Sequence, residues 1–445
     1  MKSKKRAARF AAKRGGEPTL AKTLLAAVSV WVCVTEAQQV IVPQPQSSYS
    51  TTPPALYEEA TNNQMEVFDS NPSDANSIAD EPFHWGLLTL RPHVFYSLIY
   101  ADGLQSSPSN HQSTAINEIS PGMLINIGRH WSLDYTPTLT YYSNRHFQDS
   151  LDQSVLLTGG TSYGDWDFGL SQSYAFTTDP QVETASQTPT ETYNTALSAL
   201  WKFGDRMSVN FGLQQNFQFT SPPGLGGGAD PQLNSFQTLD NSRDWSTLEW
   251  LNYQFAPRFD AGVGAGVGYV GVDTGPDQTY EQLQGRVNWR ATDKISIQAN
   301  AGFEEMQFQT GGAGDLFNPV FGAAIQYQPF EQTRISLNAS RTVVPSSFQD
   351  QVQENTSVSA SLNQRLLQKF YLDLGVGYNS IDYAGTAGLG GTRTDNYYFL
   401  NARLSHPFLK RGTLAIFFQH TENSSSQPGF GYASNQVGLE VGYSY

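Results

Sequence analysis

Apolar and polar residues alternate along the chain from about residue 84 to its end. Successive side chains of a strand point to opposite sides, so this period of two is typical of strands with two unlike faces. In the stretch 207–219 one face is polar or glycine, and the other is apolar apart from Gln215. The apolar positions of that face are Met207, Val209, Phe211, Leu213, Phe217 and Phe219. The pattern predicts an all-β protein.

The connections between the alternating runs are short and long by turns along the chain, so that each short connection is followed by a long one. Tight turns are expected at 128–130, 164–165, 204–206, 256–258, 292–294, 329–332, 367–369 and 408–412. Longer polar segments are expected at 102–113, 144–153, 178–191, 220–242, 273–279, 309–315, 344–356, 383–394 and 421–434. This asymmetry predicts an antiparallel up-and-down β-barrel of about 18 strands, with about 16 as the other possible count.

The apolar faces need a partner, which could be a second sheet or lipid. Aromatic residues gather at the ends of the runs, whereas a sandwich would place its largest residues in the middle. Two aromatic belts with aliphatic residues between them match the two interfaces of a membrane. The sequence therefore predicts that the outer face contacts outer-membrane lipid, with a girdle near the short turns that includes Trp131, Trp166, Trp201, Trp289 and Phe370.

The composition agrees with a barrel better than with a helical membrane protein. Only 15% of the 445 residues are charged, and the mean hydropathy is −0.40. Past residue 40 no apolar run reaches the length that a transmembrane helix requires. Transmembrane strands alternate, and so their hydropathy averages to a polar value.

The N-terminal segment 1–37 has the features of a secretory signal peptide. Eight basic residues accompany the apolar run "TLLAAVSVWVCV", which is followed by "TEA". This order predicts export through the Sec pathway and cleavage after Ala37; a short anchor helix is the alternative. Cys33 is the only cysteine, so the exported chain would have neither disulfides nor thiolate chemistry. Residues 38–82 are predicted to form a flexible, acidic and proline-rich periplasmic extension, and residues 83–445 the barrel.

The net charge of the whole chain is −14. Loss of the basic segment 1–37 would make the chain more acidic still. A chain with this charge is a poor nucleic-acid binder, and none is expected as a partner.

The last strand ends in the sequence "NQVGLEVGYSY", in which Val441, Tyr443 and Tyr445 alternate to a terminal aromatic residue. This ending resembles the C-terminal signal of bacterial outer-membrane proteins, which the barrel-assembly machinery recognises. The body, from "LTLRPHVFYSLIYADGLQSSP" to "ISPGMLINIGRHWSLDYTPTLTYYS", resembles the putative β-barrel porin-2-like family of Gram-negative bacteria over about residues 84–445. The resemblance implies a barrel in the outer membrane and leaves the oligomeric state open.

Motifs for catalysis or cofactor binding do not stand out. The seven histidines are scattered and form no metal-ligand pair. The glycine-rich stretch 224–231 lacks the lysine and the following helix of a phosphate-binding loop, and "DTGPDQ" at 273–278 does not follow a calcium-binding pattern. We therefore expect no enzyme, no metal and no cofactor, while a Ser/His lipase pair that meets only in space stays an alternative.

Charged residues on the inner face are the candidate pore lining. Acids lie on the early and middle strands and bases on the later ones, so a transverse field would cross the channel if the barrel closes with these halves opposed. The alternative is that neighbours such as Arg365, Asp373 and Arg403 simply pair along the wall. The full set is Asp134, Asp167, Asp260, Arg286, Arg290, Arg334, Arg365, Asp373 and Arg403.

Taken together, the sequence predicts a passive outer-membrane channel for small hydrophilic solutes, with sugars or oligosaccharides as candidates. A barrel that exports surface polysaccharide is a close variant, and a structural or adhesive barrel with a blocked lumen is the alternative. The loop 220–242 is expected either to constrict the pore or to stay exposed.

Overall fold

All regular structure among the described residues is β. No helix there is long and apolar enough to cross a membrane. The expected signal peptide 1–37 and extension 38–82 lie outside the described part. The computed structural model describes residues 83–104, 112–181, 183–184, 186–221, 239–309, 315–346, 351–385, 393–409 and 411–445.

Eighteen long strands form one antiparallel barrel, which confirms the predicted fold class and the larger of the two strand counts. Three two-residue strands accompany them: β1 (His84–Trp85), β7 (Pro180–Gln181) and β8 (Ser186–Gln187). The long strands are β2 (Leu88–Asp102), β3 (Ser113–Ile127), β4 (Trp131–Tyr142), β5 (Ser150–Tyr163), β6 (Trp166–Thr177), β9 (Thr190–Lys202), β10 (Met207–Thr220), β11 (Ser242–Ala256), β12 (Phe259–Val272), β13 (Gln278–Thr292), β14 (Ile295–Phe308), β15 (Leu316–Phe330), β16 (Thr333–Pro345), β17 (Gln351–Leu366), β18 (Phe370–Gly385), β19 (Arg393–Phe408), β20 (Gly412–Ser425) and β21 (Tyr432–Ser444).

The barrel closes where its first and last long strands pair. β2 runs antiparallel to β21, with partners from His93↔Ser444 to Asp102↔Asn435. Each of the other long strands pairs with its neighbours in the chain. The backbone groups of every long strand are thus bonded on both sides, as a chain in hydrocarbon requires.

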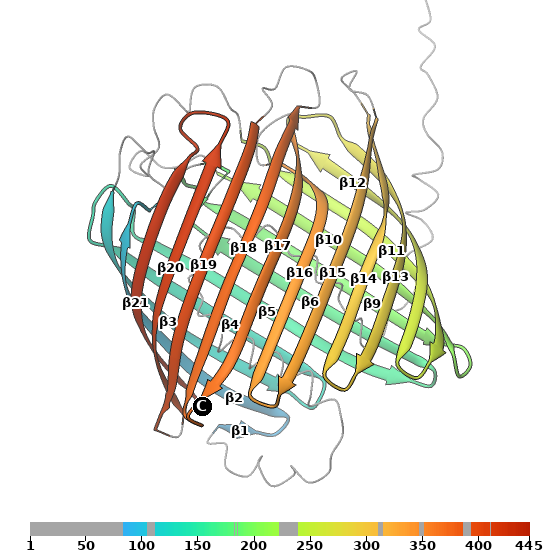
Figure 1. Cartoon of the computed structure of the whole chain (residues 1–445), viewed down its shortest axis with the longest axis horizontal. Helices are drawn as coiled ribbons and strands as arrows, with labels where there is room; N and C mark the ends of the chain where they lie inside the picture. Colours follow the sequence, from blue (N-terminus) through green and yellow to red (C-terminus); the bar gives the residue numbers. More distant parts are fainter. Residues whose placement is uncertain are drawn as a thin grey trace, which may run out of the picture.

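The two ends of the barrel differ as the sequence predicts. Eight short turns lie at one end and nine longer connections at the other. Figure 1 shows the short turns at the lower rim, together with the end of β21, and the longer loops at the upper rim. We call these the turn end and the loop end; the expected pattern corresponds to periplasm and cell exterior.

The two faces of each strand differ in exposure. On β2 the outward Leu98 and Tyr100 are 44% and 53% exposed, whereas the inward Phe95 and Ile99 are 8% and 3% exposed. Buried polar side chains such as Ser97, Thr140 and Gln436 lie on inward positions. The barrel therefore has an apolar outer wall and a largely polar inner wall.

A row of inward-facing glycines on β12 makes room for large side chains of its neighbours. A Cβ on Gly264 would lie 2.6 Å from the ring of Trp250 on β11, and one on Gly268 would lie 2.1 Å from the ring of Tyr280 on β13. Trp250 is only 4% exposed. The wall is thin here, and the two rings occupy the space that side chains of β12 would fill.

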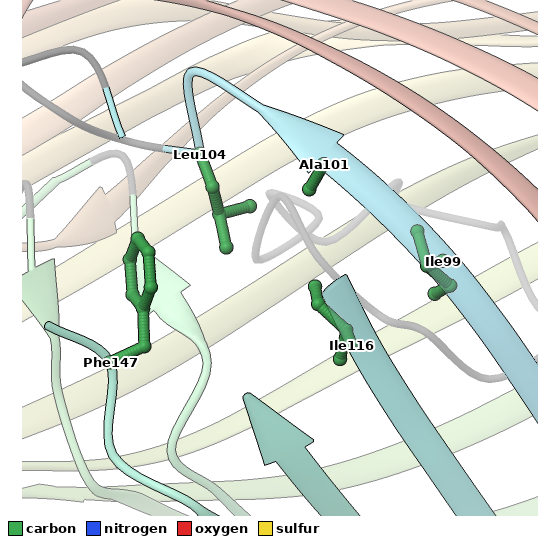
Figure 2. Packing of buried hydrophobic residues seen from close by; sticks show 5 residues of the cluster. All are labelled: Ile99, Ala101, Leu104, Ile116 and Phe147. Carbon is green, nitrogen blue, oxygen red and sulfur yellow. The ribbon is translucent and has the colours of Figure 1, made fainter. Parts of the chain in front are cut away.

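Apolar packing inside the barrel is concentrated at the loop end. Phe147, from the loop between β4 and β5, belongs to one cluster with Ile99 and Ala101 of β2, with Leu104 and with Ile116 of β3, and Leu104 lies between Phe147 and Ala101 (Figure 2). Ile99, Ala101 and Ile116 are inward positions, so this loop folds over the interior rather than away from it.

We expect Gly264→Ala to destabilise the barrel by about 1–3 kcal/mol, because the added methyl group must displace the Trp250 ring. The measurement is the temperature at which the folded band is lost in a heat-modifiability gel. Gly285→Ala is the matched control: Gly285 faces outward on β13, and the nearest atoms to a Cβ there are 4.0 Å away. Equal melting of the two variants would contradict the packing described here.

Candidate functional site in the barrel lumen

The loop between β6 and β9 is packed across the mouth of the barrel. We call residues 178–189 the crossing loop; residues 182 and 185 lie outside the described part. On its own side of the barrel it is tied to the loop that carries Phe147. The Gln148 backbone N–H donates to Gln187 Oε1 at 2.8 Å, and Gln187 Nε2 donates to the Gln148 carbonyl at 3.1 Å. Gln187 and Thr188 are buried.

The other contacts of the crossing loop are made through Glu183. Ser346 Oγ, just after β16, donates to Glu183 Oε1 at 2.6 Å. Arg393 Nη1, at the start of β19, donates to the Glu183 carbonyl oxygen at 3.1 Å. Six strands separate β9 from β16, and six separate β19 from β6 on the other side. The crossing loop therefore reaches from one wall of the barrel to the wall opposite.

Arg393 is held rigidly for this contact. Its guanidinium carbon lies 3.8 Å from the ring centroid of Tyr383 and 4.0 Å from that of Phe430. Its Nη2 lies 3.1 Å from Asp395 Oδ2, and Arg393 is only 3% exposed. Two aromatic faces and a carboxylate fix the charge, so the Glu183–Arg393–Ser346 contact, here named the latch, is built from ordered groups.

An acidic cluster lies beneath the other end of the crossing loop. Burial of Asp179, together with the negative charges of Asp152 and Glu118, raises the pKa of its carboxyl group well above the ordinary value. Asp152 Oδ1 accepts a bond of 3.0 Å from the Thr178 backbone N–H. No group of three or more His, Cys, Asp or Glu side chains in the described part is arranged to hold a metal ion. The surroundings of Asp179 in the packed loop therefore favour the protonated form of its carboxyl group.

The predicted acidic lining residues face inward near the turn end. Asp134 accepts a hydrogen bond from Thr136 Oγ1 at 2.9 Å. Asp167 forms an ion pair with Lys202 of β9. Asp260 accepts a bond from Asn288 Nδ2 at 2.8 Å. Each carboxylate therefore has a local partner on its own or a neighbouring strand.

Arg286 is braced against the middle of the inner wall. Its Nε donates to Asn252 Oδ1 and its Nη2 to Asn210 Oδ1, both at 2.8 Å. Its guanidinium carbon lies 4.5 Å from the Trp250 ring centroid. The contacts span four strands, from β10 to β13, so the positive charge has a fixed position in the lumen.

The remaining predicted bases have different surroundings. Arg290 is exposed beside the irregular pairing of Trp289 and Thr292, and Arg334 is exposed on an inward position of β16. Arg365 donates from Nε and Nη2 to the Gln368 carbonyl, at 3.1 and 2.8 Å. Arg365 therefore caps the turn after β17 at the rim of the barrel.

A ladder of charges does cross the strands that close the barrel. Arg403 Nε lies 2.8 Å from Glu440 Oε2 of β21, and its Nη1 lies 3.7 Å from Asp373 Oδ2 of β18. Asp373 also accepts from Asn363 Nδ2 at 2.7 Å. Of the three residues in the pairing alternative, Asp373 and Arg403 contact each other, while Arg365 does not take part.

The girdle candidates lie at strand ends on the turn side. Trp166 begins β6 and stacks on Trp201 of β9, with ring centroids 5.6 Å apart. Trp131 begins β4, Phe370 begins β18, and Trp289, near the end of β13, is 46% exposed. All five occupy outward positions.

The last residues of the chain form part of the closing seam. Val441 pairs with Tyr96, and Tyr443 with Val94. The Tyr445 backbone N–H donates to the Pro92 carbonyl at 3.0 Å. The residues predicted to form the assembly signal therefore lie in the seam between the first and last long strands.

Sequence reasoning did not find the crossing loop. The latch joins residues 163 and 210 positions apart, and no local pattern connects them. For the loop 220–242, the expectation of an inward constriction falls mainly on 222–238, outside the described part. The glycine-rich stretch 224–231 lies there as well.

Eighteen tilted strands with an apolar outer wall, aromatic strand ends and a polar interior define an outer-membrane β-barrel of the porin type. Residues 277–445 match the family described as Putative beta-barrel porin 2. The resemblance to this family predicted from sequence is confirmed over that part. Over that part the chain is therefore similar to a porin family, and the closed 18-strand barrel has the architecture of outer-membrane proteins.

Solved barrels share the general shape at low sequence identity. Pseudomonas aeruginosa OccK2 (OpdF) has a TM-score of 0.43 and 9% identity, over 80% of this chain and 98% of that one. P. aeruginosa OpdK, solved with vanillate, has a TM-score of 0.42 and 9% identity, over 80% and 99%. Acinetobacter baumannii OccAB3 has a TM-score of 0.41 and 8% identity, over 80% and 99%. The chain matched none of the curated proteins.

Raising the pH is expected to loosen the crossing loop. Asp179 has a raised pKa in the packed loop, so packing is most stable when the carboxyl is protonated. That stability is lost as the pH rises through the raised pKa. Open dwell times in planar bilayers should lengthen as the pH rises from about 4, and Asp179→Asn should remove most of this dependence.

Asp273→Asn is the control for this prediction. Asp273 lies in another connection at the loop end, where hydrogen bonds from Arg243 and Asn241 lower the pKa of its carboxyl group. This variant should keep the pH dependence of the parent. A pH response that survives Asp179→Asn would show that the acidic cluster does not control the loop.

Proposed function

We propose that this protein is a passive pore for small hydrophilic solutes, with sugars or oligosaccharides as the favoured class. The inner wall carries mainly Ser, Thr, Asn, Gln and Gly between its charges. Such side chains exchange hydrogen bonds with hydroxylated solutes without a strong preference for charge. Eighteen strands enclose an interior wide enough for water.

The crossing loop is the observation that carries the proposal further. It places ordered, buried residues across the mouth, where a permeant must pass. Loops that fold inward narrow a wide barrel and set the size of the solutes that pass. We propose that release of the latch widens the passage.

A barrel with a blocked lumen is the second candidate, because the same loop favours it. Thr188 is 0% exposed and Gln187 3% exposed, so the loop is packed like part of a core. If it never leaves, the loops at the outer rim would be the working surface, as in a structural or adhesive barrel.

Arg393→Gln should separate these two functions. Loss of the buried charge and of its bond to Glu183 should weaken the latch by about 1–3 kcal/mol, roughly a 5- to 150-fold rise in the ratio of open to closed mouths. Conductance steps in planar bilayers and the swelling of liposomes in sugars of rising mass should both increase.

Arg341→Gln is the matched control for the latch experiment. Arg341 also lies toward the loop end, but on an outward position, where it pairs with Glu354. It should leave conductance unchanged. If neither the parent nor Arg393→Gln conducts, the passive pore is wrong and the blocked barrel stands.

The charges of the inner wall should set ion preference. Replacing Arg286, Arg290 and Arg334 together by Gln should shift the reversal potential in a salt gradient toward cation selectivity, because three positive charges leave the lumen. Asp134 and Arg334 lie on opposite walls, on the third and thirteenth long strands. An unchanged reversal potential would rule out the transverse field.

A further inference from the structure

One carboxylate lies on the outer wall at a depth where lipid is expected. Glu249 is on β11, and Trp245, Leu251 and Tyr253, on outward positions of the same parity, are 44%, 44% and 37% exposed. Its Cα partner on β12 is Ala265, which lies between the outward Val263 and Val267. Trp250, the next residue, is buried inside the barrel. The register therefore places Glu249 outside.

Glu249 is also far from either rim of the apolar band. It lies four residues from Trp245 toward the loop end and four from Tyr253 toward the turn end. Four residues of strand rise about 13 Å, or roughly 10 Å of depth at the usual tilt. An acid midway between two aromatic belts is in the most apolar part of a bilayer, where charged groups on the lipid face destabilise a barrel.

Glu249 continues a patch of polar residues that crosses four neighbouring strands. Gln172 of β6, Thr195 of β9 and Gln215 of β10 are Cα partners in one outward row. Thr247 of β11 is the Cα partner of Leu213, which lies two residues before Gln215 on the same face of β10. The Thr247 hydroxyl bonds to the Glu249 carboxyl. We call Gln172, Thr195, Gln215, Thr247 and Glu249 the outer polar patch.

The patch satisfies only part of its own hydrogen-bonding capacity. Thr195 Oγ1 donates to Gln172 Oε1 at 2.6 Å. Within the described part of the chain the Gln215 amide makes no hydrogen bond. Lipid tails offer no partner, and unmet polar groups are costly in hydrocarbon. The patch therefore has the chemistry of a surface that another protein covers.

We propose that the outer polar patch is the contact between two copies of this chain, related by a two-fold axis along the membrane normal. Such an axis brings each polar residue to a partner at its own depth, so the depths match without further adjustment. Glutamine amides and threonine hydroxyls each donate and accept, and the Glu249 carboxyl accepts, so the patch is complementary to itself. The adjacent outward residues of β12, Ala261 and Ala265, are small and permit close approach.

Cysteine cross-linking tests this contact in the full chain. In a Cys33→Ser background, Ala265→Cys places a thiol beside Glu249, and Ala402→Cys on β19 is the matched control. Ala402 also faces outward, four residues from the exposed Tyr398. Oxidation in outer membranes with a lipid-soluble catalyst should yield a two-copy species from Ala265→Cys and at least tenfold less from Ala402→Cys.

Glu249→Leu provides the second arm, because it removes the carboxylate without harming a monomer that faces lipid. Added to Ala265→Cys, it should keep the heat-modifiable folded band and lower the cross-linked yield at least tenfold. Equal cross-linking at positions 265 and 402, an unchanged yield in folded Glu249→Leu protein, or an adduct with a different protein would each overturn the proposal.

Discussion

The satisfaction of backbone hydrogen bonds in hydrocarbon is the constraint on which the rest of this structure depends. A sheet in lipid cannot leave an edge, so the first and last long strands must meet. They do so along ten pairs, from His93↔Ser444 to Asp102↔Asn435. Because these two strands pair antiparallel, the number of long strands must be even, and the last strand ends at the rim where the first one begins.

Closure also leaves the interior with a separate task. The inner wall does not need to exclude water, so it can carry charges, provided that each is held in place. Arg286 is held by two asparagines and a tryptophan, and Arg403 by two carboxylates. The glycines of β12 serve the same arrangement, because they allow Trp250 to lie flat enough to support Arg286.

The fold could be predicted from sequence because its rules are local. A period of two marks the strands, and turn residues mark their ends. The eight short turns fall within a residue or two of their expected places, as at 164–165 and 367–369. The sequence alone identifies Gln215 as a polar residue on an otherwise apolar strand face. That Thr195 and Gln172 lie beside it follows only from the strand register.

The mouth could not be predicted, because its contacts join distant parts of the chain. Neither Glu183 nor Arg393 has a sequence context that distinguishes it from other polar loop residues. Their meeting depends on the circumference of the barrel and on the length of the crossing loop. Likewise, the carboxyls of Asp179 and Asp152 share one environment only after β5 and the crossing loop have packed.

The crossing loop has a mechanical consequence as well. The pairing of the strands fixes the circumference of the barrel, but its cross-section can change from round to oval more easily. The crossing loop is attached to opposite walls, so it sets the diameter of the barrel along its own direction. Six strands lie between the attachments of the crossing loop on either side. The barrel can therefore become oval only by straining the hydrogen bonds of Glu183. The mouth and the wall are thus one elastic unit, and a deformation that begins in the wall is felt at the mouth.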